Sequence, residues 1–117
     1  METLEKFDYI KAHDPDSMER LKRLLDRKGF LADGNVYGER FTDRQFNLVF
    51  EPLLEAAYDR ARILECLEQK EMTVQQLSDG LSMDNYTVFN YMKDLLRKNH
   101  VEIAAFEERR PVFRKRY

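Results

Sequence analysis

The sequence predicts a mainly helical protein of the α+β class. Apolar residues recur at intervals of three or four through most of the chain, which is the pattern of helices that bury one face. Several of these stretches begin with helix-capping residues, and the last part of the chain contains two runs rich in β-branched and aromatic residues. With 117 residues, 43% of them hydrophobic, the chain is expected to form one compact domain rather than two.

The first part of the chain predicts two short helices. Leu4, Phe7 and Ile10 have the spacing of one helix face. Asp14 is placed to cap a second helix, with a proline at its first position, and we expect this helix to end at Gly29. The glycine-rich stretch after it is predicted to be a loop.

A long apolar stripe follows that loop. Residues 42–45 match a capping box, and we expect a short helix to about Phe50, an interruption at Pro52, and a long helix over residues 52–70. The stripe is longer than one small domain needs to bury. It is therefore interpreted either as core alone or as core plus the seam of a homodimer formed by helix 52–70 and the N-terminal segment. The predicted division is a helical extension over residues 1–50 and one compact unit over residues 51–117.

Two helices are predicted next, separated by a tight turn. Thr73 and Gln76 form a capping box for the first helix, which Gly80 is expected to end with a positive φ angle. Asp84 is placed to cap the second helix, over residues 85–98. The turn between the two helices is therefore short.

Strand signals complete this part of the chain. Residues 101–106 and 112–117 predict two strands, with a polar turn at residues 107–110 between them. The order helix, turn, helix and hairpin resembles the winged helix-turn-helix of ArsR-like and MarR-like regulators of bacteria and archaea. The resemblance covers residues 73–117, and its helical part consists of Thr73 to Val88 and Lys93 to Val101.

The resemblance implies a dimeric transcriptional regulator that binds double-stranded DNA. In such regulators the start of the second helix faces the major groove, so the implied base contacts are Asn85, Tyr86, Phe89 and Asn90. Asparagine pairs with adenine edges and aromatic rings touch thymine methyl groups, which favours A·T-rich sites. The implied phosphate contacts come from the end of this helix and from the wing: Lys93, Arg97, Lys98, Arg109, Arg110, Arg114 and Arg116.

The distribution of charge gives these phosphate contacts some support. The formal net charge of the chain is −2, yet residues 109–117 contain five basic side chains and no acidic one. This is a local positive patch on a slightly acidic protein.

A protein interface is the alternative interpretation of the same helix. Tyr86, Phe89 and Tyr91 are aromatic, and the first half of helix 85–98 contains no arginine or lysine. Aromatic side chains with little charge are typical of protein contacts. The chain would then be an accessory or regulatory subunit that does not bind DNA.

Other classes of function find little support in the sequence. The single cysteine, Cys66, excludes an intrachain disulfide, and His13, His100 and Cys66 have no ligand spacing, so we expect no metal. No catalytic arrangement and no phosphate-binding loop is recognisable, so neither an enzyme nor a cofactor is expected. The charged N-terminus has no signal-peptide core and no apolar run is long enough for a membrane span, so we expect a cytoplasmic protein without membrane contact.

Overall fold

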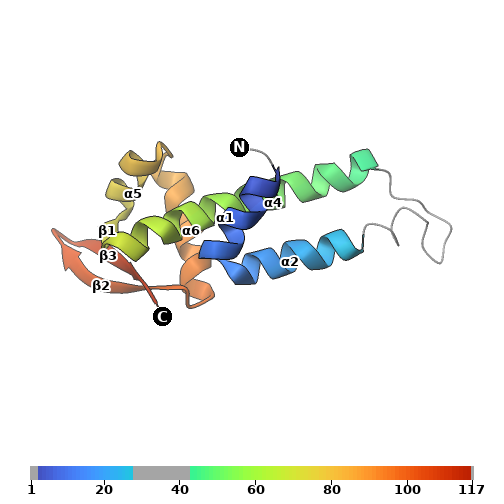
Figure 1. Cartoon of the computed structure of the whole chain (residues 1–117). Coiled ribbons are helices and arrows are strands. Elements are labelled where there is room, and N and C mark those ends of the chain that lie inside the picture. The colour runs from blue at the N-terminus through green and yellow to red at the C-terminus, as the bar shows by residue number, and fades with distance from the viewer. Residues whose placement is uncertain (1–2, 28–42, 117) are drawn as a thin grey trace. The chain divides into compact units, whose positions relative to one another are not determined.

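A computed structural model describes residues 3–27 and 43–116 of the chain (Figure 1). These residues form a mainly helical α+β structure, which confirms the predicted fold class. The helices are α1 (Thr3–His13), α2 (Pro15–Asp26), α4 (Asp43–Gln69), α5 (Val74–Leu81) and α6 (Asn85–Arg97); the strands are β1 (Met72–Thr73), β2 (Val101–Glu107) and β3 (Arg110–Lys115). None of the described helices is both long and apolar enough to cross a membrane.

The contacts within the chain form two compact units, residues Met1–Asp59 and Arg60–Tyr117. We expected a single compact domain, with its helical extension ending at residue 50. The boundary between the two units lies inside α4. We refer to the two parts as the N-terminal unit and the C-terminal unit.

In the N-terminal unit, α1, α2 and the first part of α4 enclose an apolar core. The rings of Phe46 and Phe50 stack with their centroids 5.3 Å apart, and Phe7 meets Phe50 edge-on at 6.2 Å. Asp14 caps α2 as predicted: its carboxylate accepts hydrogen bonds from the backbone N–H and the hydroxyl of Ser17. The predicted end of α2 at Gly29 and the predicted capping box at Thr42 lie outside the described residues.

The expected interruption at Pro52 is wrong, because α4 is one helix that includes this proline. A proline inside a helix removes one backbone hydrogen bond and crowds the preceding turn, at a cost of about 3 kcal/mol. Phe46 and Phe50 before it and Leu54 after it are all buried. Since each buried side chain of this size contributes roughly 1.5–3 kcal/mol, packing on both sides of the proline outweighs that cost.

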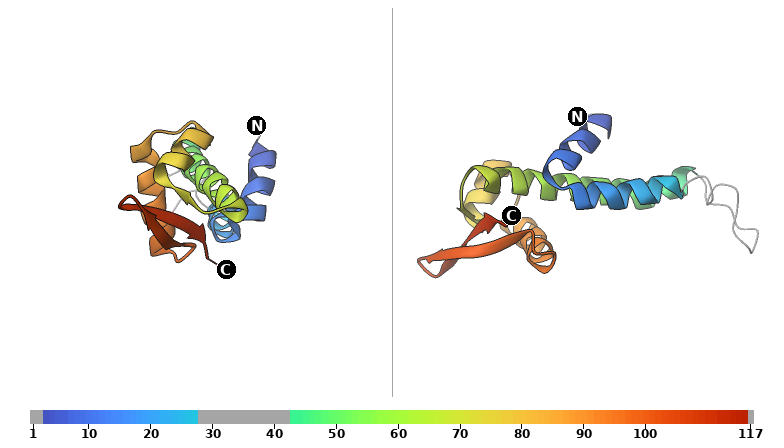
Figure 2. Two further views of the ribbon diagram at one scale, coloured as in Figure 1. Left: turned by 90° about the vertical axis from the view of Figure 1, so that its left-hand side faces the viewer. Right: turned by 60° about the horizontal axis from the view of Figure 1, so that its bottom comes forward.

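The C-terminal unit packs α5, α6 and the end of α4 against a small sheet. Its core consists of Ile63, Leu64, Leu67, Leu77, Val88, Met92, Leu95, Val101 and Phe113. The sheet is antiparallel with the strand order β1-β3-β2, and its β2–β3 hairpin extends beyond the helices of this unit (Figure 2). Sequence patterns predicted only the two hairpin strands. They missed β1, since a strand of two residues is too short to show alternation.

The hairpin turn consists of two residues with positive φ, Glu108 at 48° and Arg109 at 70°. Positive φ at both central positions is characteristic of the tight turn that suits the natural twist of a hairpin. The turn therefore presents the Arg109 side chain at the tip of the hairpin. The second strand of the hairpin, β3, begins at Arg110, one residue before Pro111.

The helix end expected at Gly80 is displaced by two residues. The predicted capping box of Thr73 and Gln76 is present, but α5 runs to Leu81, and Ser82 takes the left-handed conformation with a φ of 56°. The carbonyl of Leu81 accepts a hydrogen bond from the guanidinium of Arg62 at 3.0 Å, which helps to satisfy the helix end. Gly80 therefore lies within the last turn of α5.

Replacing Gly80 with alanine is expected to raise the free energy of unfolding by about 0.5–1 kcal/mol. Apart from Gly80, its two chain neighbours and the nearby backbone of α5 itself, no atom lies within 4 Å of the position that a Cβ atom would take at Gly80, and the φ angle of Gly80 is not positive. Alanine would thus lower the entropy of the unfolded chain without straining the helix. Chemical denaturation of the two proteins measures the difference. A destabilised alanine variant would show that this position is more constrained than its surroundings indicate.

Candidate nucleic-acid interface

The start of α6 is fixed by Asp84, as the sequence predicted. The Asp84 carboxylate accepts hydrogen bonds of 2.8 Å from both the backbone N–H and the hydroxyl of Thr87. The backbone hydrogen bond from Thr87 is the main reason that the pKa of Asp84 is lowered, followed by the bond from the Thr87 hydroxyl. The carboxylate is therefore committed to capping, and it sets the direction of the first turn of α6.

Two aromatic side chains protrude from this first part of α6. Tyr86 is 76% exposed and Phe89 is 50% exposed. The ammonium group of Lys93, one turn later, lies 5.2 Å from the centre of the Phe89 ring. This arrangement holds a positive charge beside the exposed ring through a cation–π contact. The opposite side of α6 is anchored in the core by its buried stripe of Val88, Met92 and Leu95.

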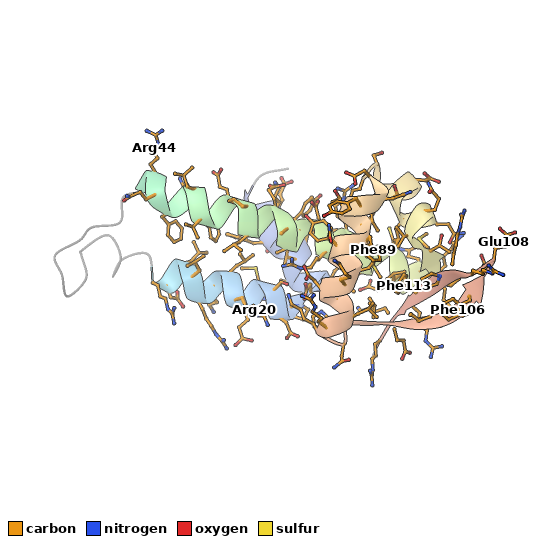
Figure 3. The ribbon with its side chains drawn as sticks, turned by 180° about the vertical axis from the view of Figure 1, so that it is seen from behind. Arg20, Arg44, Phe89, Phe106, Glu108 and Phe113 are labelled. Atoms are coloured by element: carbon orange, nitrogen blue, oxygen red, sulfur yellow. The ribbon has the colours of Figure 1, made fainter. Side chains whose placement is uncertain are left out.

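A groove of about 510 Å³ connects the start of α6 to the hairpin. Most of its surface is apolar. Figure 3 marks Phe89 on α6 and Phe113 on β3, which both line it. The remaining lining residues are Thr73, Val74, Gln75, Asn85, Tyr86, Arg110 and Pro111. Three of the four predicted base-contact residues therefore share one surface with Arg110 of the hairpin.

The two asparagines of α6 differ in their surroundings. The amide nitrogen of Asn85 donates a hydrogen bond of 2.9 Å to the side-chain oxygen of Gln75, which ties the start of α6 to α5. The Gln75 amide in turn donates to Asp79 at 2.9 Å. The bond to Gln75 fixes the orientation of the Asn85 amide, whose nitrogen also supplies the donor that pairing with an adenine edge uses. Asn90 is half-buried and lies outside the groove lining.

Several of the predicted phosphate contacts already take part in interactions within the chain. Arg114 forms an ion pair of 2.6 Å with Glu102, its cross-strand partner. Arg97 lies 4.0 Å from Asp94 one turn away. Lys98 is the C-cap residue of α6 and is half-buried. These three cations are less available to a phosphate group than the sequence indicated.

The remaining basic residues are more accessible. Arg109, Arg110 and Arg116 are exposed, and none forms an ion pair with another described residue. Arg109 lies in the hairpin turn and Arg110 begins β3. Accessible positive charge is therefore present at the tip of the hairpin. Arg116 follows β3, and its backbone N–H donates to the carbonyl of His100 at 2.9 Å.

Tyr91 lies away from the exposed aromatics with which the sequence grouped it. It is half-buried and packs against the core of the unit. Residues on a helix one or two positions apart point in different directions, so Tyr91 cannot share a surface with Phe89. The sequence did not show that residues of α5 and β3 line the same groove as α6. They come together because β1, just before α5, pairs with β3, which is far away in the chain.

Among residues 3–27 and 43–116, no three histidine, cysteine, aspartate or glutamate side chains are grouped so that they could hold a metal ion. Burial raises the pKa of the Cys66 thiol, with a smaller contribution from Glu65. A thiol with a raised pKa is poorly nucleophilic at neutral pH.

Comparisons of the chain with protein-family models, curated proteins and solved structures gave no match. Its function is therefore inferred from the surface of the C-terminal unit.

Proposed function

We propose that the C-terminal unit is a winged helix-turn-helix that binds double-stranded DNA and regulates transcription. In this proposal α5 and α6 are the helix-turn-helix, α6 enters the major groove, and the β2–β3 hairpin is the wing. The observation that carries the proposal is the shared surface of Tyr86, Phe89 and Arg110. A helix with an exposed start, beside a hairpin whose tip arginines form no ion pair with another described residue, can contact bases and phosphates at the same time.

Each part of this surface has a separate role. Arg109 and Arg110 contact phosphates and release condensed counterions, which supplies affinity for any DNA sequence. Tyr86 and Phe89 touch thymine methyl groups, and Asn90, which lies on α6 outside the groove and one turn after Tyr86, pairs with an adenine edge. Together these contacts favour A·T-rich duplexes, with a modest difference in affinity.

A protein-binding module is the second candidate, and the apolar groove favours it. Val74, Pro111 and Phe113 add apolar surface beside the exposed aromatic rings, and such surfaces are typical of protein interfaces. The ion pairs of Arg97 and Arg114 also reduce the positive charge available to DNA. A stoichiometric protein partner, together with no retention on DNA at low salt, would favour this candidate over the first.

Replacing Asn90 with alanine is expected to weaken binding to the preferred A·T-rich duplex by about fivefold to 150-fold, which corresponds to the roughly 1–3 kcal/mol of one base contact. Binding to a G·C-rich duplex is expected to stay the same. Fluorescence anisotropy with labelled duplexes measures both affinities. The Asn47→Ala variant is the control, because Asn47 is an exposed asparagine on α4. An equal loss on both duplexes would remove Asn90 from base recognition.

A further inference from the structure

The first part of α4 has a second apolar face that no described residue covers. Phe46, Phe50 and Leu54 point into the core of the N-terminal unit, while Leu48 is 69% exposed and Val49 and Leu53 are each 48% exposed. Val49 and Leu53 are four positions apart, and Leu48 lies beside Val49. Residues four positions apart lie one above the other on a helix, so Val49 with Leu53 and Leu48 with the exposed Pro52 form two adjacent rows, which together make one broad apolar stripe. We call Leu48, Val49, Pro52 and Leu53 the outer stripe.

Charges at the two ends of the outer stripe are opposite. Arg44, Leu48, Glu51 and Glu55 follow one another at intervals of four, three and four residues, so they lie in one row along α4. Arg44 stands at the N-terminal end of this row and points away from α2 (Figure 3). Glu51 and Glu55 stand toward its other end. Lys6 forms an ion pair with Glu55, whose side chain nevertheless remains 55% exposed and can accept a second cation.

A second copy of the same helix fits this arrangement in one direction only. In an antiparallel pair the two outer stripes face each other, and Arg44 of each copy lies near Glu55 of the other. In a parallel pair Arg44 of each copy would lie level with Arg44 of the other and well away from Glu55, so no opposite charges would meet. A two-fold axis across the middle of the stripe thus makes the surface complementary to itself, as an isologous dimer requires.

We propose that the outer stripe of α4 is the interface of an antiparallel homodimer. The apolar side chains supply the favourable free energy of association, and the Arg44–Glu55 pairs fix the direction. The proposal concerns the N-terminal unit alone. It does not depend on DNA binding, and its test uses no DNA.

The test measures the molar mass of the full chain in solution by sedimentation equilibrium, from micromolar to submillimolar concentration. We expect a mass that rises to twice the 14.1 kDa of one chain. The variants Leu48→Glu and Leu53→Glu are each expected to raise the dissociation constant by at least about tenfold, because a carboxylate in an apolar seam loses its hydration. Both positions are exposed, so circular dichroism is expected to show an intact fold.

The control is Phe106→Glu, which places the same charge at a 66% exposed apolar position on β2. It should leave the dissociation constant unchanged. A wild-type chain that stays monomeric at every concentration would overturn the proposal. A dimer that resists both stripe variants, or one that the control disrupts equally, would place the interface elsewhere and overturn it as well.

Exchanging the charges tests the direction of the pair. Arg44→Glu alone and Glu55→Arg alone should each weaken the dimer, since each leaves two like charges facing across the interface. The double variant restores opposite charges and should recover most of the lost affinity. Loss of the Lys6 contact cannot produce this recovery, because the double variant also lacks that contact. A double variant weaker than either single one would contradict the antiparallel arrangement.

Discussion

Replacing Leu77 with alanine is expected to lower the free energy of unfolding of the C-terminal unit by about 3 kcal/mol. Leu77 is 0% exposed and belongs to the core cluster that joins α4, α5, α6 and the sheet. Alanine would leave a cavity among Ile63, Val88 and Leu95, which are also fully buried. Those neighbours cannot all move to fill it, because they are anchored on two other helices, α4 and α6. Urea denaturation followed by circular dichroism measures the loss.

The matched control for this change is Phe106→Ala on β2. Phenylalanine loses more atoms than leucine, but Phe106 is 66% exposed. Its replacement should therefore change the free energy of unfolding by no more than about 0.5 kcal/mol. If the two variants lost similar stability, Leu77 would not be a core residue of the C-terminal unit.

Replacing both Arg109 and Arg110 with alanine is expected to weaken DNA binding about tenfold or more at moderate salt, for A·T-rich and G·C-rich duplexes alike. The two arginines lie at the tip of the hairpin and form no ion pair with another described residue. Each phosphate contact contributes about −0.9 to the slope of log affinity against log salt concentration. The double variant should thus bind with a slope shallower by about 1.8. Titrations at several salt concentrations measure it.

The control for the hairpin variant removes two arginines from α2, Arg20 and Arg23, both exposed. Removing them lowers the net charge of the protein by the same amount but leaves the hairpin intact. We expect it to keep most of the affinity and the full slope. If both double variants lost affinity equally, general charge rather than the hairpin would drive binding.

Much of the local structure could be predicted from the sequence, because short-range patterns determine it. The capping residues Asp14, Thr73 and Asp84 each accept the hydrogen bonds expected of them. Val88, Met92 and Leu95 are buried at the spacing of one helix face. These features depend on residues three or four positions apart, so the local sequence is enough to predict them.

Features that depend on distant contacts were missed or misplaced. Pro52 was expected to end a helix, yet packing on both sides keeps α4 continuous. The pairing of β1 with β3 joins residues far apart in the chain, and it forms one wall of the groove. The same limit applies to the candidate site. The sequence could show that Arg114 is basic, but not that Glu102 on the neighbouring strand pairs with it.

The most direct measurement is a titration of the purified full chain against a fluorescent A·T-rich duplex at a series of salt concentrations. If the α6–hairpin surface binds DNA, affinity should fall steeply with salt, by about 0.9 logarithmic units per phosphate contacted. It should also exceed the affinity for a G·C-rich duplex. No binding even at low salt would contradict DNA binding and would leave the apolar groove beside Tyr86 and Phe89 as a site for a protein partner.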